Sequence, residues 1–341
     1  MAMEQTSGTT TRPVYVIDSP RTCSQVFGKL WMAHPQLEHI FMSMMGPSIY
    51  GPESLWRGRK ASDKIQESYT DLTETANASG TGMFQPTTYQ DGAAKIEESV
   101  KDILEKGKTP WIKDHSMCIV PPPITTKWLS LTPQPPSLLA NPTAFTTPFL
   151  DSVTPIFLIR HPTLSIPSFY RKQRDILHNA ATDASFRILT SLEWTRLVFD
   201  SYLRRRGLPV SVSEDPDVTA YPAEQVPLLI ESVDLIYHTQ AVAERVCDYV
   251  GIDKGGVQYE WEPTPEEEWP PSALARAFFQ DMLESTGIQR AEKPAEMGID
   301  LDRLTAEWTE EFDEETARTL RGLVEREIPN YEYLRRFKWV V

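Results

Sequence analysis

The sequence predicts an α/β fold, a doubly wound parallel sheet with helices on both of its faces. Short apolar runs rich in β-branched residues alternate with amphipathic helical segments, which is the pattern of successive βαβ units. The chain has 341 residues, 40% of them hydrophobic, enough for a substantial core. Since no shift in composition marks a boundary, we expect one domain over residues 13–341, after a flexible N-terminal segment, residues 1–12.

The first element is the run VYVID, residues 14–18, which is typical of a buried strand. Ser19 and Pro20 interrupt it, and a helix is expected from Ser24 to about Ala33. This strand–turn–helix order is the arrangement that holds anions, because unpaired N–H groups converge at the start of such a helix.

The second strand is expected over residues 110–120, after an amphipathic helix at 93–108. A third is expected over 154–162, followed by a helical stretch at 163–177. A fourth, over 226–232, precedes a helix at 241–252 that carries Val242, Val246 and Val250 on one face.

Two segments break this alternation. Residues 121–149 are rich in proline, threonine and large apolar side chains, so we expect an irregular but packed flap without long helices. Residues 260–271 form an acidic stretch, which we expect to be a solvated loop ahead of two C-terminal helices.

Charge and cysteine usage exclude several classes of protein. The net charge of −14 argues against binding to nucleic acid or to an anionic membrane. No apolar run is long enough for a membrane span, and the first residues do not resemble a signal peptide. The three cysteines lack CxxC spacing, which indicates neither a disulfide framework nor a metal site. We therefore expect a cytoplasmic protein without a metal.

The loop after the first strand carries the first specific motif. Its sequence, SPRTCSQ, resembles the 5′-phosphosulfate-binding loop of the PAPS-dependent sulfotransferases, which follows a pattern like [ST]-P-[KR]-[ST]-G-[ST]-T (PAPS is 3′-phosphoadenosine 5′-phosphosulfate). The matching positions are Ser19, Pro20, Arg21, Thr22 and Ser24. Cys23 replaces the glycine and Gln25 replaces the last threonine. Taken by itself, the same sequence also fits an ordinary strand–helix connection.

The second motif is FLIRHP, in which a strand ends at Arg160, with Ser168 eight positions later. In the sulfotransferases an arginine and a serine at this spacing hold the 3′-phosphate of the cofactor. The physical chemistry agrees, because an arginine at the carboxyl end of a parallel strand faces the ligand crevice and suits a bidentate phosphate contact. A surface arginine and a helix-capping serine are the alternative.

The third motif is WIKDHSM, which resembles the family's K-x-H phrase through Lys113 and His115. The resemblance implies that His115 is the general base and that Lys113 lies near the transferring group. Histidine suits proton transfer, since its ordinary pKa of about 6.5 is close to working pH. A structural histidine is the alternative.

These motifs occur in the family's order, and the segment IPNYEYL, residues 328–334, resembles the closing helix of bacterial and fungal members. The resemblance implies a three-layer sandwich related to the P-loop NTPases and transfer of a sulfuryl group from PAPS to a hydroxyl. The implied catalytic residues are His115, Lys113 and Arg21. The implied cofactor contacts come from Arg21, Thr22, Cys23, Ser24, Gln25, Arg160 and Ser168.

The acceptor is expected to be an apolar small molecule, of the kind made in fungal secondary metabolism. Trp128, Phe145 and Trp194 are the candidate substrate contacts, with core packing as their alternative role. A homodimer is compatible with this fold.

The altered loop leaves two other hypotheses open. The fold could have lost PAPS and kept His115 and Lys113 for dehydration, cyclisation or hydrolysis in natural-product biosynthesis. The chain could also be a non-catalytic binding protein. These hypotheses differ in whether the chain binds nucleotide and whether it depends on His115.

Overall fold

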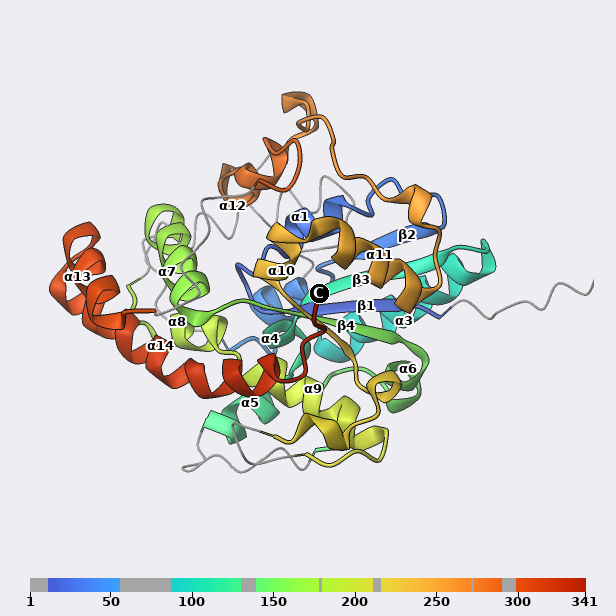
Figure 1. Cartoon of the computed structure of the whole chain (residues 1–341), viewed down its shortest axis with the longest axis horizontal. Helices are drawn as coiled ribbons and strands as arrows, with labels where there is room; N and C mark the ends of the chain where they lie inside the picture. Colours follow the sequence, from blue (N-terminus) through green and yellow to red (C-terminus); the bar gives the residue numbers. More distant parts are fainter. Residues whose placement is uncertain are drawn as a thin grey trace, which may run out of the picture.

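The structure, a computed structural model, describes residues 12–55, 87–129, 139–177, 180–210, 216–270, 273–289 and 299–341 (Figure 1). Residues 1–11 of the predicted flexible segment lie outside these ranges. Arg12, its last residue, is held in place, because its guanidinium donates hydrogen bonds to the carbonyl oxygens of Asp151 and Val153.

A parallel sheet forms the centre of the molecule. Its described strands are β1 (Val14–Asp18), β2 (Leu37–Phe41), β3 (Thr109–His115), β4 (Thr154–Ile159) and β5 (Leu228–Glu231), in the spatial order β2-β3-β1-β4-β5. Every pairing is parallel. The sequence predicted four of these strands, and the predicted doubly wound sheet is confirmed.

Two differences concern the strands. β2 was not predicted, because four of its five residues are partly exposed at the sheet edge and include Glu38 and His39. The second predicted strand, residues 110–120, ends earlier than expected. It stops at His115, and residues 116–119 instead turn into a short helix.

The described α-helices are α1 (Ser24–Lys29), α3 (Tyr89–Glu105), α4 (Ser116–Ile119), α5 (Pro122–Leu129), α6 (Thr147–Ser152), α7 (Pro162–Lys172), α8 (Ala184–Thr190), α9 (Glu193–Arg205), α10 (Ser232–Tyr237), α11 (Thr239–Val250), α12 (Ala273–Leu283), α13 (Leu301–Glu311) and α14 (Glu314–Arg335). Two π-helical turns, η1 (Gly46–Tyr50) and η2 (Gln173–Leu177), complete the longer elements. Within the described ranges, no helix combines the length and the apolar character that a bilayer crossing requires.

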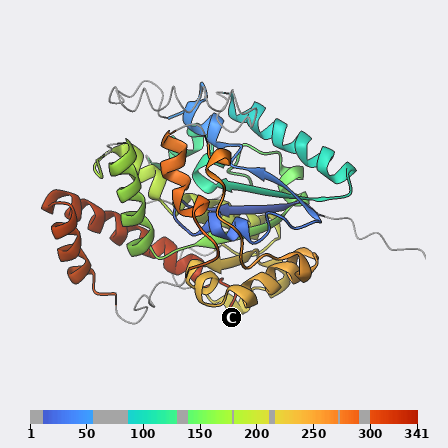
Figure 2. The same cartoon turned by 90° about the horizontal axis from the view of Figure 1, so that it is seen from above.

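Helices cover both faces of the sheet, as expected for three layers. Figure 2 shows α3 and α11 on opposite sides of the strands. Alternation along β1 explains this, because Tyr15 and Ile17 belong to a core shared with α3, α6 and α9. Val14 and Val16 face the other way, into a core shared with α1 and α11.

A third apolar cluster joins α7 and α8 to α13 and α14, which lie together at one side of the sheet (Figure 1). The sequence predicted two helices after the acidic stretch, whereas the structure has three, α12, α13 and α14. The solvated loop is confirmed over its described part, since residues 260–270 contain no buried side chain.

The proline-rich segment 121–149 is packed but less irregular than predicted. It contains α5 and the start of α6, because proline is well tolerated in the first turn of a helix. Phe145 and Phe149 stack on each other in the core, as expected for a packed flap. Residues 130–138 lie outside the described ranges.

The sheet order locates the crevice in which such folds bind ligands. β1 lies between β3 and β4, and the chain turns to opposite sides of β1 on its way to β2 and to β4. In open α/β sheets, ligands bind beyond the carboxyl ends of the strands at this switch point. Asp18 and His115 end β1 and β3 there, and Arg160 directly follows β4.

Candidate active site

The loop between β1 and α1 has an unusual backbone. Arg21 and Cys23 adopt φ angles of 68° and 64°, the left-handed region in which side chains are strained. Cys23 stands where the matching loop pattern has glycine, the residue that adopts this conformation without cost. The backbone therefore keeps the shape that the glycine pattern encodes, although the side chain opposes it.

Asp18 is at the centre of a buried polar cluster behind this loop. Its side chain is fully buried and accepts a hydrogen bond from the Thr22 hydroxyl, with 3.0 Å between Oγ1 and Oδ2. It also accepts one from the hydroxyl of Ser24. His115 Nδ1 lies 2.6 Å from Asp18 Oδ1, and Lys113 Nζ lies 3.3 Å from the same oxygen.

These contacts determine the charge of Asp18. Burial by itself would raise the pKa of this carboxyl group, but the charges of Lys113 and His115 and the surrounding donors lower it to about 2. Asp18 is consequently ionised at neutral pH. The sequence analysis did not identify Asp18, since a single acidic residue after an apolar run carries no motif.

The strand register brings the cluster together. Asp18 pairs with His115 and Val16 pairs with Lys113 across β1 and β3, so the two end residues lie side by side at the same edge. Lys113 and His115 are two positions apart and contact each other, with 3.2 Å between Nζ and Nδ1. As predicted, both lie at the end of a strand.

His115 is set up as a neutral base. Burial lowers the pKa of its imidazole, and the Lys113 charge lowers it further, against the opposing effect of Asp18. At pH 7 the ring is therefore uncharged and can accept a proton.

A second polar cluster lies on the other side of the loop. Arg21 Nε donates to Ser168 Oγ at 3.1 Å, although the two residues are 147 positions apart. Arg160 Nη1 donates to the carbonyl oxygen of Arg21 at 2.9 Å. The structure thus brings together the loop arginine and the Arg160 and Ser168 pair, which the sequence predicted to act on one ligand.

Arg160 is a largely buried cation next to Arg21. Its side chain forms no ion pair with any residue in the described ranges, and its buried Nε has no hydrogen-bond partner there. Burial lowers the pKa of this guanidinium, and the nearby charge of Arg21 adds to the effect. A buried cation without an anion is costly, which makes this place suited to an anionic group.

An acidic residue from α12 also reaches the second cluster. Asp281 Oδ2 lies 3.1 Å from Arg21 Nη2 and 3.4 Å from Lys172 Nζ, one helical turn after Ser168. Neither Asp281 nor Lys172 was predicted as a site residue. Their proximity depends on how α12 packs, and no local pattern encodes that.

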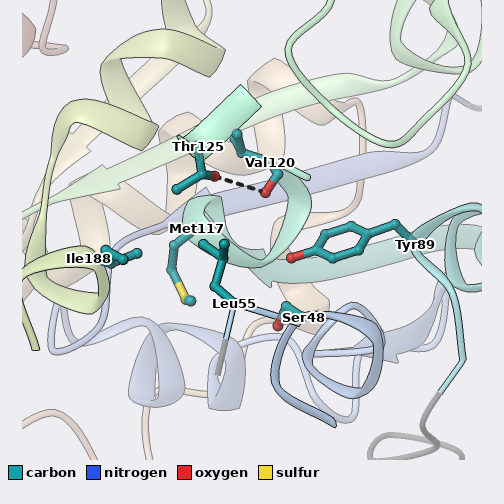
Figure 3. A pocket seen from close by; sticks show the side chains of 7 residues that line it. All are labelled: Ser48, Leu55, Tyr89, Met117, Val120, Thr125 and Ile188. Carbon is teal, nitrogen blue, oxygen red and sulfur yellow. Dashed lines mark hydrogen bonds between the residues drawn. The ribbon is translucent and has the colours of Figure 1, made fainter. Parts of the chain in front are cut away.

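A small pocket lies beside Met117, two positions after His115 in the sequence (Figure 3). Its lining combines apolar side chains with three hydroxyl-bearing ones: Ser48, Leu55, Tyr89, Met117, Val120, Thr125 and Ile188. Figure 3 shows the phenol oxygen of Tyr89 pointing into the pocket. Tyr89 is only 5% exposed, and its hydroxyl makes no hydrogen bond to residues that the structure describes.

The predicted substrate residues lie elsewhere. Phe145 packs edge-on against Tyr15, and Trp194 donates its indole N–H to the carbonyl oxygen of Ile188. Both rings are buried in the core and are absent from the lining of this pocket. Trp128 lies in α5, and its side chain is outside the described part of the chain.

The predicted cofactor residues of the loop have mixed surroundings. The hydroxyls of Thr22 and Ser24 bind Asp18, so a phosphate contact would require them to share or leave that carboxylate. Gln25 is partly exposed in the first turn of α1. No cluster of three metal-binding side chains occurs in the described ranges.

Comparisons with known proteins find sulfotransferases as relatives. No protein-family model matches the chain. It is 27% identical over 349 residues to sulfotransferase ppzF of Metarhizium majus (strain ARSEF 297), covering 94% of this chain and 95% of that protein. It is 28% identical over 276 residues to sulfotransferase ppzF of Metarhizium rileyi (strain RCEF 4871), covering 72% of this chain and 77% of that relative.

Among solved structures, the chain is similar to the sulfotransferase domain of the Synechococcus PCC 7002 olefin synthase, with a TM-score of 0.36 and 15% identity over 91% of this chain and 98% of that one. The likeness to the two fungal proteins extends over most of the chain, and the layered parallel sheet is of the expected kind. The chain is therefore sulfotransferase-like, and its similarity is to fungal sulfotransferases.

Proposed function

We propose that this protein transfers a sulfuryl group from PAPS to the hydroxyl of a small uncharged molecule. The observation that carries this proposal is the Arg160 site: within the described ranges this largely buried guanidinium forms no ion pair, and it contacts Arg21, which in turn binds Ser168. A guanidinium in that state fits a phosphate, since its planar fork makes charge-assisted hydrogen bonds to two phosphate oxygens.

Arg160 and Ser168 would hold the 3′-phosphate, and Arg21 with the loop backbone would hold the 5′ end. PAPS, when bound, supplies the activated sulfuryl group. Arg21 and Lys113 would stabilise negative charge that develops at the reacting centre. Lys113 is 3% exposed, so its charge acts with little screening.

His115 would take the proton from the acceptor hydroxyl. Its imidazole is neutral at working pH for the reasons given above, and its side chain remains 13% exposed at the crevice. This part of the reaction needs a base, a positioned hydroxyl and fixed cations, all of which the chain itself supplies.

The acceptor would occupy the pocket that includes Met117, two positions after His115. None of the lining side chains carries a charge, which favours an uncharged acceptor. The free hydroxyl of Tyr89 would hydrogen-bond a polar atom of that molecule and fix its orientation.

We place this activity in the cytoplasm. Cys23, Cys118 and Cys247 are all free thiols, as expected in a reducing compartment.

Calorimetric titration with adenosine 3′,5′-bisphosphate tests the cofactor assignment. Arg160→Ala is expected to weaken binding by about 100-fold, since it removes two charge-assisted hydrogen bonds of roughly 1.5 kcal/mol each. Arg171→Ala is the matched control, because Arg171 lies on α7 but pairs with Glu311, and it should leave the affinity unchanged. No binding by the wild type, or equal binding by Arg160→Ala, would refute the assignment.

An acceptor screen with PAPS then tests the pocket. Once a substrate is found, Tyr89→Phe is expected to raise KM about fivefold, as a lost neutral hydrogen bond of about 1 kcal/mol predicts. His115→Ala should abolish turnover but keep nucleotide binding. An unchanged KM in Tyr89→Phe would place the acceptor elsewhere.

One observation favours a second candidate, chemistry without PAPS at the same site. Asp18 already binds the hydroxyls of Thr22 and Ser24, and Cys23 adds a side chain where the family pattern has none. An absence of nucleotide binding together with a natural-product conversion that depends on His115 would support this candidate.

A further inference from the structure

We infer that Asp18 is the positioning residue for His115: it fixes the imidazole as the Nδ1–H tautomer and leaves Nε2 as the nitrogen that accepts the proton. This inference rests on the proposed role of His115 as a base. It concerns which nitrogen acts and what determines that choice.

The geometry between Asp18 and His115 allows one arrangement of the proton. Nδ1 lies 2.6 Å from Oδ1, a hydrogen-bond distance, and an ionised carboxylate can only accept. The hydrogen must therefore sit on Nδ1. Lys113 Nζ, which is only a donor, is 3.2 Å from Nδ1 but can direct its hydrogen to Asp18 Oδ1 at 3.3 Å.

Asp18 is itself held as an ionised acceptor. Oδ2 accepts from Thr22, the Ser24 hydroxyl adds another donor, and Lys113 provides the compensating charge. The side chain is fully buried and is the last residue of β1, so backbone and packing both fix its position. Asp18 can therefore impose an orientation on the ring.

The other ring nitrogen, Nε2, is the one available to the acceptor. In the described ranges, His115 forms its hydrogen bonds and ion pairs through Nδ1, and no partner is found for Nε2. The ring is neutral, so Nε2 has a lone pair available for an acceptor proton. When that proton arrives, the resulting imidazolium remains hydrogen-bonded to the Asp18 carboxylate, which stabilises the charge.

Asp18→Asn should reverse the tautomer. The amide N–H₂ of asparagine can donate to Nδ1, which favours a hydrogen on Nε2 and removes its lone pair. For a base held in this way, loss of the correct tautomer lowers kcat by roughly 10²- to 10⁴-fold. Binding of adenosine 3′,5′-bisphosphate should change far less, because the Arg160 site lies on the other side of the loop.

Two-bond ¹H–¹⁵N NMR spectra of the full chain, labelled with ¹⁵N-histidine, test this directly. The sequence has six histidines, and the signals of His115 are identified by their loss in His115→Ala. The wild type should show a protonated Nδ1 and an unprotonated Nε2, and Asp18→Asn should show the reverse. Asp114→Asn is the matched control, because its buried carboxylate binds Tyr15 and the Met44 N–H rather than His115.

The outcomes separate this inference from the proposed function. A protonated Nε2 in the wild type overturns the inference, even if Asp18→Asn fails to fold. The expected tautomer in a protein that does not bind the nucleotide supports the Asp18 assignment while the PAPS proposal fails. With an active enzyme, equal kcat and the same pH profile for wild type and Asp18→Asn would also overturn it.

Discussion

Replacing Cys23 by glycine would test the strain in the loop that precedes α1. The residue has a φ of 64°, which costs a side-chain-bearing residue about 1–2 kcal/mol. Glycine avoids this cost but gains flexibility in the unfolded chain, which lowers stability by roughly 0.5–1 kcal/mol relative to alanine. Cys23→Gly should therefore be more stable than Cys23→Ala by about 0.5–1 kcal/mol.

The comparison with alanine isolates the backbone effect. Cys23 packs against the core between the sheet and α11, and both variants lose the contacts of its sulfur atom. What differs between them is a Cβ atom in a left-handed conformation. Any contribution of the thiol cancels in the difference.

Gly28 is a matched position at which the stability difference between glycine and alanine should have the opposite sign. It lies inside α1, and a Cβ atom there would meet no atom within 4 Å. Gly28→Ala should stabilise the protein by about 0.5–1 kcal/mol, as is usual in a helix. The preference for alanine over glycine thus reverses within five residues.

Urea unfolding of the wild type, Cys23→Gly, Cys23→Ala and Gly28→Ala measures these differences in stability. The differences follow from the unfolding midpoints when all four curves are fitted with one m-value. A Cys23→Gly variant less stable than Cys23→Ala would contradict the left-handed geometry of the loop. The same variants, titrated with adenosine 3′,5′-bisphosphate, would also report on function. Glycine should bind at least as tightly as cysteine, since it lets the backbone approach a phosphate more closely.

Two further changes test the electrostatics. Asp281→Asn removes the carboxylate that pairs with Arg21 and Lys172. Calorimetry at low salt should then show adenosine 3′,5′-bisphosphate binding about two- to fivefold more tightly than to the wild type, and weaker binding would contradict this. Burial, and then the nearby charge of Glu193, raise the pKa of Glu327 to about 7. Between about pH 4.5 and pH 7 the native state therefore holds a proton that the unfolded state has released, so the free energy of unfolding falls as pH rises through this window. Relative to wild type, Glu327→Gln should therefore gain about 3 kcal/mol of unfolding free energy between pH 4 and pH 8, and a difference that does not change with pH would refute this.

Much of the fold could be read from local patterns. β1, β4 and β5 are buried and mostly apolar runs, whose hydrophobicity is visible without any partner, and β3 was found from its apolar start and the amphipathic helix before it. β2 was missed because it forms at an edge from a mixed sequence, and only its pairing with β3 makes it a strand. The Phe145 and Trp194 rings show the same limit, since an aromatic residue reads alike whether it packs in a core or contacts a ligand.

The sequence by itself determined the strand–turn–helix order and placed Lys113, His115 and Arg160 in or next to buried strands, because these features depend on neighbours within a few positions. Only the tertiary structure decided which groups meet. Asp18 reaches His115 through the register of β1 with β3, and Arg21 reaches Ser168 and Asp281 across 147 and 260 positions. Such contacts arise when separate elements pack together, so their charges and pKa values follow from the fold and not from any local pattern.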